Sequence, residues 1–265
     1  MMQSNTLTHI RTESDLNLAL AALTSADARF AALMTRAGRP LLRRRPDGFA
    51  GLAATVVSQQ LSTASAGAIW ARLAAAFDPF EPQAIIRARA SKLARLGLSA
   101  PKIRALKAIA RAVASERLAL ASLVTIEAEA AHAALTAVHG IGPWTADIYL
   151  LSCLGHADVW PAGDLALQEA ARLAFALPER PSAKEMVALA EMWRPLRAVA
   201  ARVLWTYYRA VKRRDGAPIA PSAASAIAQA LPKLSPKPKR VKRAKSKQRR
   251  TEQARSKRGG NGRRT

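Results

Sequence analysis

The fold is decided by residues 135–146, Leu-Thr-Ala-Val-His-Gly-Ile-Gly-Pro-Trp-Thr-Ala. The pattern predicts a helix, a four-residue hairpin over 139–142, and a second helix that opens on Pro143. Proline suits a first helical turn because it has no N–H to lose there. Gly140 and Gly142 allow positive φ angles and the close approach of another backbone. The stretch therefore predicts a turn whose outward N–H groups can hold a phosphate without sequence preference.

A lone carboxylate follows this hairpin. Asp164 stands after a Pro-Ala-Gly turn and before the run Leu-Ala-Leu-Gln at 165–168. Taken alone, a Gly-x-Gly turn is more often an ordinary corner between helices, and an Asp here is more often a helix N-cap. Together, the hairpin and Asp164 resemble the motif of the helix-hairpin-helix (HhH-GPD) DNA glycosylases. Pro-Trp-Thr-Ala at 143–146 resembles the 3-methyladenine DNA glycosylase II (AlkA-like) branch, and the resemblance covers roughly residues 45–210.

The resemblance implies an all-α fold in which two helical lobes flank a DNA-binding cleft, with the hairpin and Asp164 on one wall. Hydrophobic periodicity agrees, because no alternating run of β-branched residues appears in the part expected to fold. We expect an N-terminal helix and linker at 1–44 that is part of the helical fold. A glycosylase core at 45–212 and a disordered Lys/Arg-rich tail at 213–265 follow. The N-terminal β-lobe of longer relatives has no candidate segment, which predicts a short form of the family.

Capping signals give the expected ends of several helices. One helix is expected to run from Ser14-Asp15 to about Thr35. Further helices are expected to start at Ser62 or Thr63, at Thr125, and at a capping box formed by Ser182 and Glu185.

The charge of the chain is strongly positive and unevenly distributed. Its 265 residues include 42 Lys or Arg against 18 Asp or Glu, a net charge of +24. Residues 212–265 hold 18 of the basic residues and two acids, so +16 lies in this arm and +8 in residues 1–211. Both parts favour a polyanionic partner, most simply nucleic acid, although a tail of this kind can also act only as a solubilising arm.

Cysteine usage and hydropathy restrict the class of protein. Cys153 is the only cysteine, so the chain can form no internal disulfide and cannot carry the four-cysteine iron–sulfur cluster of endonuclease III-type relatives. The N-terminus lacks the apolar segment of a signal peptide, and no charge-free run of about 18 apolar residues appears. We therefore expect a cytoplasmic protein, associated with the nucleoid of a bacterium, and no membrane partner.

The resemblance also implies two DNA-binding segments. In the family, the polar turn between two apolar helices at 58–62 enters the minor groove, and one of its side chains fills the gap left by an extruded base. By position this plug is Gln60, with Leu61 as the competitor, unless the two amides merely cap helix ends. The DNA-binding residues implied are Gln59, Gln60, Leu61, Ser62, His139, Gly140, Ile141, Gly142 and Thr145.

The chemistry implied is hydrolysis of the bond between a damaged base and deoxyribose, after the base has been flipped out of the helix at a cost of a few kcal/mol. Trp144 offers a flat π surface, and a cationic alkylated purine would gain roughly 0.5–2 kcal/mol there by cation–π interaction. Since such a base is a good leaving group, the enzyme must chiefly stabilise an oxocarbenium-like sugar. Asp164 is the candidate catalytic carboxylate for this purpose.

Trp144 also indicates the reaction type. Bifunctional relatives carry at this position a lysine that forms a Schiff base with the sugar, which tryptophan cannot do. We therefore predict a monofunctional glycosylase that leaves an intact abasic site. Ile148 and Leu196 occupy pocket positions where relatives have aromatic residues, so stacking would fall on Trp144 and Trp160. The predicted lead substrates are 3-methyladenine and 7-methylguanine, with hypoxanthine and ethenoadenine less certain.

Other conspicuous side chains are assigned to packing by their helical spacing. They are Trp193, Trp205, Tyr207 and Tyr208. His132 is expected at the surface or as a filler of the core, without a catalytic role.

Two further classes of protein fit parts of the sequence. A noncatalytic, nucleoid-type DNA-binding protein would use the same hairpin and basic tail. An RNA-binding or ribosome-associated factor would use the tail, because the tail would contact any polyanion. For the glycosylase we expect double-stranded DNA with alkylated bases as partner, a monomer, no catalytic metal and no cofactor. A structural monovalent cation at the hairpin is suggested only by the resemblance.

Overall fold

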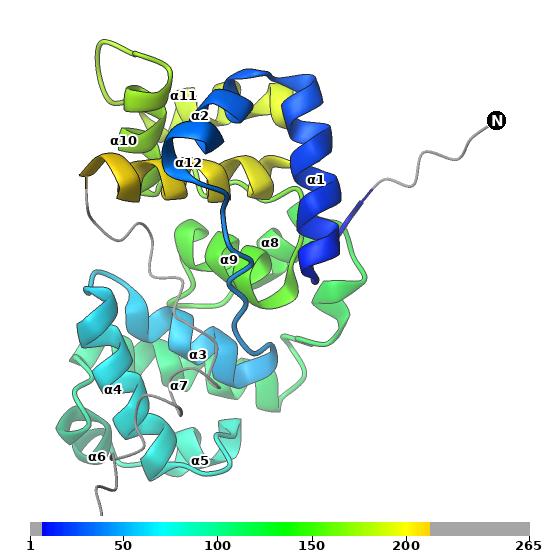
Figure 1. Ribbon diagram of the computed structural model, residues 1–265. Helices are drawn as coiled ribbons and strands as arrows, with labels where there is room; N and C mark the ends of the chain where they lie inside the picture. Colours follow the sequence, from blue (N-terminus) through cyan, green and yellow to red (C-terminus); the bar gives the residue numbers. More distant parts are fainter. Residues whose placement is uncertain (1–6, 213–265) are drawn as a thin grey trace, which may run out of the picture. The chain divides into compact units, whose positions relative to one another are not determined.

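The computed structural model describes residues 7–212, and within this range the chain is all-α (Figure 1). The expected tail at 213–265 lies outside the described residues. The described helices are α1 (Glu13–Ala26), α2 (Arg29–Ala37), α3 (Gly48–Ser58), α4 (Thr63–Ala76), α5 (Pro82–Arg87), α6 (Ala90–Arg95), α7 (Ala100–Ala114), α8 (Ala128–Thr136), α9 (Pro143–Tyr149), α10 (Leu165–Ala174), α11 (Ala183–Ala190) and α12 (Arg197–Lys212). Two 3-10 turns, η1 (Ser122–Val124) and η3 (Glu191–Trp193), and a π-helical turn, η2 (Leu150–Leu154), complete them.

These helices form two groups, which are the two lobes predicted by the sequence. In one lobe α12 packs against α1, α2, α10 and η3. In the other, α7 packs against α3, α5 and α6, and α4 packs on α3. Helix α9 contacts α3, α8 and η2 and lies between the lobes (Figure 1). The N-terminal helices therefore share a lobe with the C-terminal ones. Among the described helices there is no candidate for a transmembrane span.

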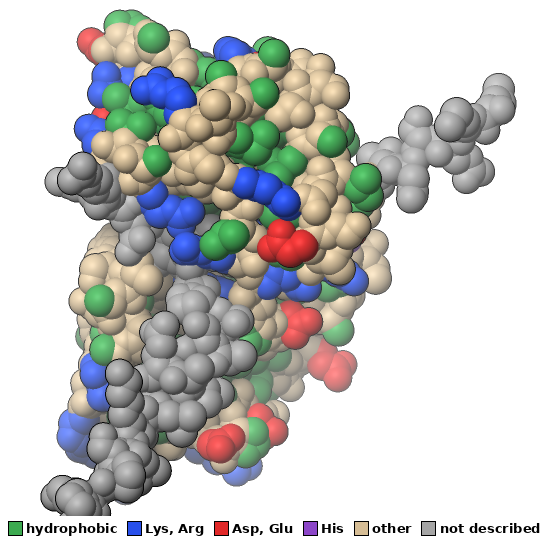
Figure 2. Space-filling model, in the orientation of Figure 1, with side chains coloured by type: hydrophobic (Ala, Val, Ile, Leu, Met, Phe, Trp, Pro, Cys, Tyr) green, Lys and Arg blue, Asp and Glu red, His purple; other side chains and the backbone are tan. Residues whose placement is uncertain are grey.

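Basic side chains are prominent on the described surface. Figure 2 shows Lys and Arg side chains gathered near the middle of the visible face, between the helices of the two lobes. This distribution places positive charge where the lobes meet and agrees with the expected polyanionic partner.

The N-terminal region is not the single helix that we expected, since α1 and α2 are separated at Asp27. The Asp27 carboxylate accepts hydrogen bonds from the backbone N–H of Arg29 (3.1 Å) and from Nε1 of Trp193 (3.0 Å). Because Trp193 lies 166 positions away in the chain, no local signal marks this break. The first helix also starts earlier than expected, because Thr12 and Asp15 form a capping box.

Capping explains the other helix starts. Ser62 caps α4, and Ser182 and Glu185 form a capping box at α11, so both predictions are confirmed. Thr125, in contrast, does not cap α8. Its hydroxyl donates to the Ser122 carbonyl oxygen (2.9 Å) within the preceding turn, which shows that the local hydrogen bond competes with the cap.

Two arginines hold the turn that follows α9. Helix α9 continues into η2, which ends at Gly155 in the left-handed conformation (φ +82°). Arg202 donates to the Leu151 carbonyl oxygen (3.0 Å), and Arg44 donates to that of Cys153. These guanidinium groups satisfy carbonyls left free by the end of the helix. The Cys153 thiol is buried, as expected, and burial raises its pKa to about 11.

Candidate active site

The predicted hairpin lies between α8 and α9, and its two glycines differ in backbone conformation and in surroundings. Gly140 has φ +92°, and a Cβ added there would lie 2.3 Å from Cβ of Ala105 on α7. Gly142 has φ −84° and open space around it, and it is the N-cap residue of α9. The expectation of positive φ therefore holds at Gly140 alone. In the same turn His139 is exposed and Ile141 is buried.

Asp164 begins α10 and is held on both carboxylate oxygens. Oδ1 accepts hydrogen bonds from the backbone N–H of Leu167 (2.8 Å) and from Nε1 of Trp205 (3.1 Å). Oδ2 accepts a hydrogen bond from Nε1 of Trp144 (2.8 Å). The residue is only 6% exposed. Asp164 is thus an N-cap, and it is also a buried carboxylate whose plane is fixed by two indoles from other helices.

Trp144 therefore has a contact that its sequence position did not reveal. It is partly buried on the first turn of α9, and it lines a cleft of about 820 Å³ whose wall also includes Gly163, the residue before Asp164. Its ring can face the cleft while its N–H orients the carboxylate. Trp205, which we assigned to packing, contributes the same kind of donor from α12. The indole N–H groups join the hairpin helix, the Asp164 turn and the C-terminal helix at one carboxylate.

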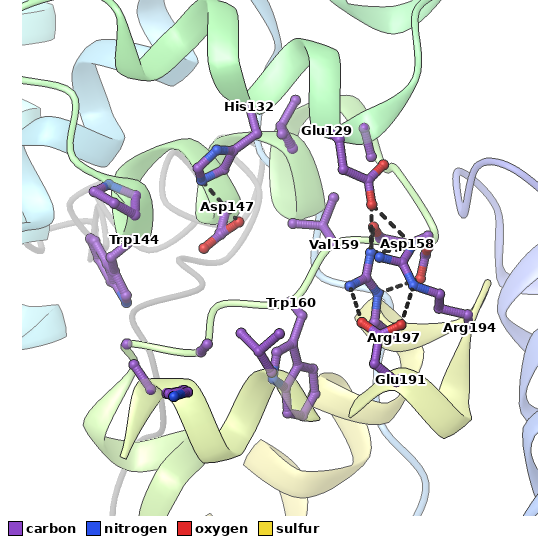
Figure 3. A pocket seen from close by; sticks show the side chains of 18 residues that line it. Glu129, His132, Trp144, Asp147, Asp158, Val159, Trp160, Glu191, Arg194 and Arg197 are labelled. Carbon is purple, nitrogen blue, oxygen red and sulfur yellow. Dashed lines mark hydrogen bonds and ion pairs between the residues drawn. The ribbon is translucent and has the colours of Figure 1, made fainter. Parts of the chain in front are cut away.

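The cleft is lined by residues of α8, α9, the loop before α10, α11 and the start of α12 (Figure 3). Its wall mixes aromatic and charged side chains. The main polar and aromatic ones are Glu129, His132, Trp144, Asp147, Asp158, Trp160, Lys184, Glu191, Arg194 and Arg197.

Of the remaining predicted pocket residues, only Trp160 lines this cleft. Its indole N–H donates to the Met186 carbonyl oxygen (2.9 Å), and its ring meets Trp193 edge-on at 5.3 Å. Ile148 is fully buried in the core, and Leu196 is partly buried and packs against the core. Neither belongs to the cleft wall, so the aromatic character of the wall comes from Trp144 and Trp160.

Asp147 is a cleft residue that the sequence analysis missed. It lies three positions after Trp144, which places the two side chains on one face of α9. Its carboxylate Oδ1 lies 3.6 Å from Nε2 of His132 on α8. Burial raises the pKa of Asp147 to about 8, against an opposing effect of the positive charge of Arg197. The helical spacing from Trp144 was the signal that could have identified it.

An ion-pair network holds the loop that carries Trp160. Asp158 accepts hydrogen bonds from Nε of Arg197 (2.6 Å) and from Nη1 of Arg194 (2.7 Å). Glu129 of α8 joins both arginines, with contacts of 2.9 and 3.0 Å. Since the carboxylates and guanidiniums pair with one another, their charges largely compensate within the wall.

The polar turn at 58–62 is tied directly to the hairpin helix. Nε2 of Gln59 donates to the hydroxyl oxygen of Thr145 (2.6 Å), and Thr145 itself is buried. Gln60 is exposed and stands at positive φ (+54°), whereas Leu61 is partly buried. Gln60 thus stands at the exposed tip of the turn, and its role as the plug stays a prediction.

No metal centre is formed by side chains in the described residues, where no group of three His, Cys, Asp or Glu could hold an ion. The monovalent cation suggested at the hairpin would use backbone carbonyls, and it stays a prediction.

Comparison with known proteins was made for both sequence and structure. A family model described as HhH-GPD superfamily base excision DNA repair protein matches residues 53–195. DNA-3-methyladenine glycosylase 1 of Schizosaccharomyces pombe is 32% identical over 180 residues, which cover 64% of this chain and 75% of that protein. The alkylbase DNA glycosidase-like protein mag2 of the same organism is 26% identical over 200 residues, covering 73% and 94%. The solved structure of S. pombe 3-methyladenine DNA glycosylase (Mag1) in complex with abasic DNA is similar with a TM-score of 0.65 and 28% identity. The similarity covers 74% of this chain and 97% of the Mag1 chain.

Proposed function

This chain belongs to the HhH-GPD superfamily of base excision DNA repair proteins, and on that premise we propose that it is a DNA glycosylase that removes alkylated bases from duplex DNA. The observation that carries the proposal is the buried Asp164 carboxylate, fixed by Trp144 and Trp205 at the edge of an aromatic cleft. Relatives named DNA-3-methyladenine glycosylase 1 and alkylbase DNA glycosidase-like protein support the class of substrate.

DNA binding in this proposal uses the two segments that meet at the Gln59–Thr145 hydrogen bond. The hairpin holds the backbone phosphate with N–H groups of the turn around Gly140. Gln60, at the exposed tip of the polar turn, occupies the space left by the extruded base. The Gln59–Thr145 hydrogen bond keeps the phosphate-binding hairpin and Gln60 in a fixed position relative to each other.

The extruded base enters the cleft between Trp144 and Trp160. A cationic purine is favoured there by the face of Trp144, and its positive charge makes it a good leaving group without a general acid. As the glycosidic bond breaks, positive charge develops on the sugar, and the fixed carboxylate of Asp164 stabilises that charge without reorganising. Water then completes the hydrolysis. No lysine stands at the position of Trp144, so the reaction forms no Schiff base and leaves an abasic site.

The reaction is tested directly with the full chain and methylated duplex DNA. We expect release of 3-methyladenine and 7-methylguanine, identified by chromatography, and alkali-labile abasic sites in the remaining strand. Borohydride should trap no covalent complex. Absence of released bases would overturn the glycosylase proposal, and a trapped complex would overturn its monofunctional form. Within the same proposal the protein acts as a monomer in the cytoplasm and needs no cofactor.

A further inference from the structure

Asp147 stands on the cleft face of α9. Trp144, Asp147 and Leu150 all line the cleft, at the three-residue spacing that keeps side chains on one side of a helix. Figure 3 shows the Asp147 carboxyl group facing the open centre of the cleft, with Trp144 on one side and Trp160 across from it. A base held between the two tryptophans would therefore lie beside this carboxyl group.

The Asp147 carboxyl group has few partners, in contrast to Asp164. Within residues 7–212 its one polar partner is Nε2 of His132, at 3.6 Å, which is longer than a hydrogen bond. Asp147 itself is only 9% exposed. The side chain of Asp147 is 13% exposed, and a largely buried carboxyl group whose open side faces a cleft instead of a donor is a candidate functional group.

The charged groups around Asp147 do not neutralise it. On α8, His132 is its direct neighbour, and Glu129 is bound to Arg194 and Arg197. On α12, Arg197 lies close enough to affect Asp147, but its guanidinium is paired with Asp158 at 2.6 Å. Asp147 is therefore the carboxyl group of this wall that is not paired with an arginine.

We propose that Asp147 is a specificity-determining residue that selects positively charged bases. This inference rests on the glycosylase function proposed above. When a cationic alkylpurine enters, the Asp147 proton passes to solvent through the open mouth of the cleft, and the carboxylate pairs with the base. A neutral base provides no charge to offset the cost of ionising a buried carboxyl group, so Asp147 stays protonated and the pair does not form.

The high pKa of Asp147, about 8, supports this switch because it leaves the group protonated in the empty cleft near neutral pH. Asp147 and Trp144 then detect the positive charge of the base in different ways. The indole face attracts the cation through its π electrons, whereas Asp147 adds a full negative charge only when a cation is present.

The test compares Asp147→Asn, which keeps the shape but cannot ionise, with the wild-type full chain. Single-turnover excision of 7-methylguanine, which is cationic in DNA, is measured beside excision of neutral hypoxanthine and affinity for a duplex with a tetrahydrofuran abasic analogue. We expect about a tenfold fall in 7-methylguanine excision, with the other two quantities unchanged. In wild type the rate for 7-methylguanine should rise between about pH 6 and pH 8.5, and the variant should lose this rise.

Glu127→Gln is the matched control, because Glu127 is an exposed carboxylate at the start of the same helix as His132 and lies outside the cleft. It should behave as wild type. Equal excision of 7-methylguanine by wild type and Asp147→Asn would overturn the inference, and so would a parallel fall in 7-methylguanine excision and abasic-duplex affinity. Failure of the wild type to release any base would instead overturn the glycosylase function itself.

Discussion

At the scale of single residues, the proposed active site depends on the hydrogen bonds that orient the Asp164 carboxylate. Asp164 accepts three hydrogen bonds, and two of the donors are indoles from α9 and α12. Only the third, from Leu167, is the ordinary bond of a helix N-cap. Trp144, which lines the cleft, therefore also orients the proposed catalytic carboxylate, and these two contributions can be separated by mutation.

Trp144→Phe keeps an aromatic face but removes the donor to Asp164 Oδ2. We expect excision to slow by roughly tenfold, because one hydrogen bond to a charged group contributes about 1.5 kcal/mol or more. Affinity for an abasic-analogue duplex should change little. The measurement is single-turnover excision of 7-methylguanine.

Trp193→Phe provides the control for this prediction. Trp193 donates in the same way to a carboxylate, but that carboxylate is Asp27, at the break between α1 and α2. Its loss should affect folding stability rather than the rate of excision by folded protein. Equal rates for Trp144→Phe and wild type would show that the indole N–H does not orient Asp164.

The raised pKa of Asp147 also predicts that the stability of the wild type depends on pH. Burial raises the folded-state pKa of Asp147 to about 8, above an unfolded value of about 4. The folded chain keeps the proton where the unfolded chain loses it, so wild-type stability falls as pH rises from about 4 to about 8. The Asp147→Asn variant has no carboxyl group to ionise, so its stability does not fall in this way. At pH 8 it should be more stable than wild type by about 1 kcal/mol or more.

Urea unfolding of both proteins at about pH 5 and pH 8 measures this difference. A stability difference that does not grow with pH would contradict a raised pKa at Asp147.

At the scale of elements, the hairpin depends on one glycine. Gly140→Ala should cost about 2 kcal/mol or more in the free energy of unfolding, because its φ of +92° disfavours a side chain and the added Cβ would meet Ala105 at 2.3 Å. Gly142→Ala should cost much less, since its φ is −84° and no atom lies within 4 Å. Denaturant unfolding of the two variants compares them, and equal losses would contradict this account of the turn.

The sequence predicted those elements that local chemistry determines. The start of α10 at Asp164 and the caps at Ser62 and Ser182 rest on side chains that accept hydrogen bonds from nearby backbone N–H groups. The hairpin rests on the positive φ of Gly140 and on Pro143 in the first turn of α9. The break at Asp27 was not predictable in this way, because its partner Trp193 comes from the far end of the chain.

The same limit applies to the site. Trp144 and Asp164 were found from their spacing and resemblance to a family motif, yet nothing local shows that Asp164 accepts hydrogen bonds from both Trp144 and Trp205. Ile148 was expected in the pocket, but the direction of α9 turns Asp147 to the cleft and buries Ile148. Which face of a short helix meets a cleft is determined by packing of the whole lobe.

At the scale of the whole molecule, most of the net positive charge and the proposed active site lie in different parts of the chain. The cleft and hairpin lie within residues 7–212, whereas residues 212–265 carry 18 of the 42 basic residues. Truncation after residue 212 should therefore flatten the dependence of duplex affinity on salt, because fewer counterions are released. Single-turnover excision at saturating protein should stay within about twofold of the full chain. Loss of excision on truncation would contradict this division.

The central claim, that this chain cleaves glycosidic bonds with Asp164, is tested most directly by single-turnover excision from methylated duplex DNA with wild type and Asp164→Asn. Asparagine is also a good N-cap, so α10 should still form. We predict that wild type releases alkylated purines and that the variant releases them at least about a hundredfold more slowly. Equal rates would remove Asp164 from the chemistry. Tight duplex binding without any base release by the wild type would instead identify a DNA-binding protein that has kept the scaffold and lost the reaction.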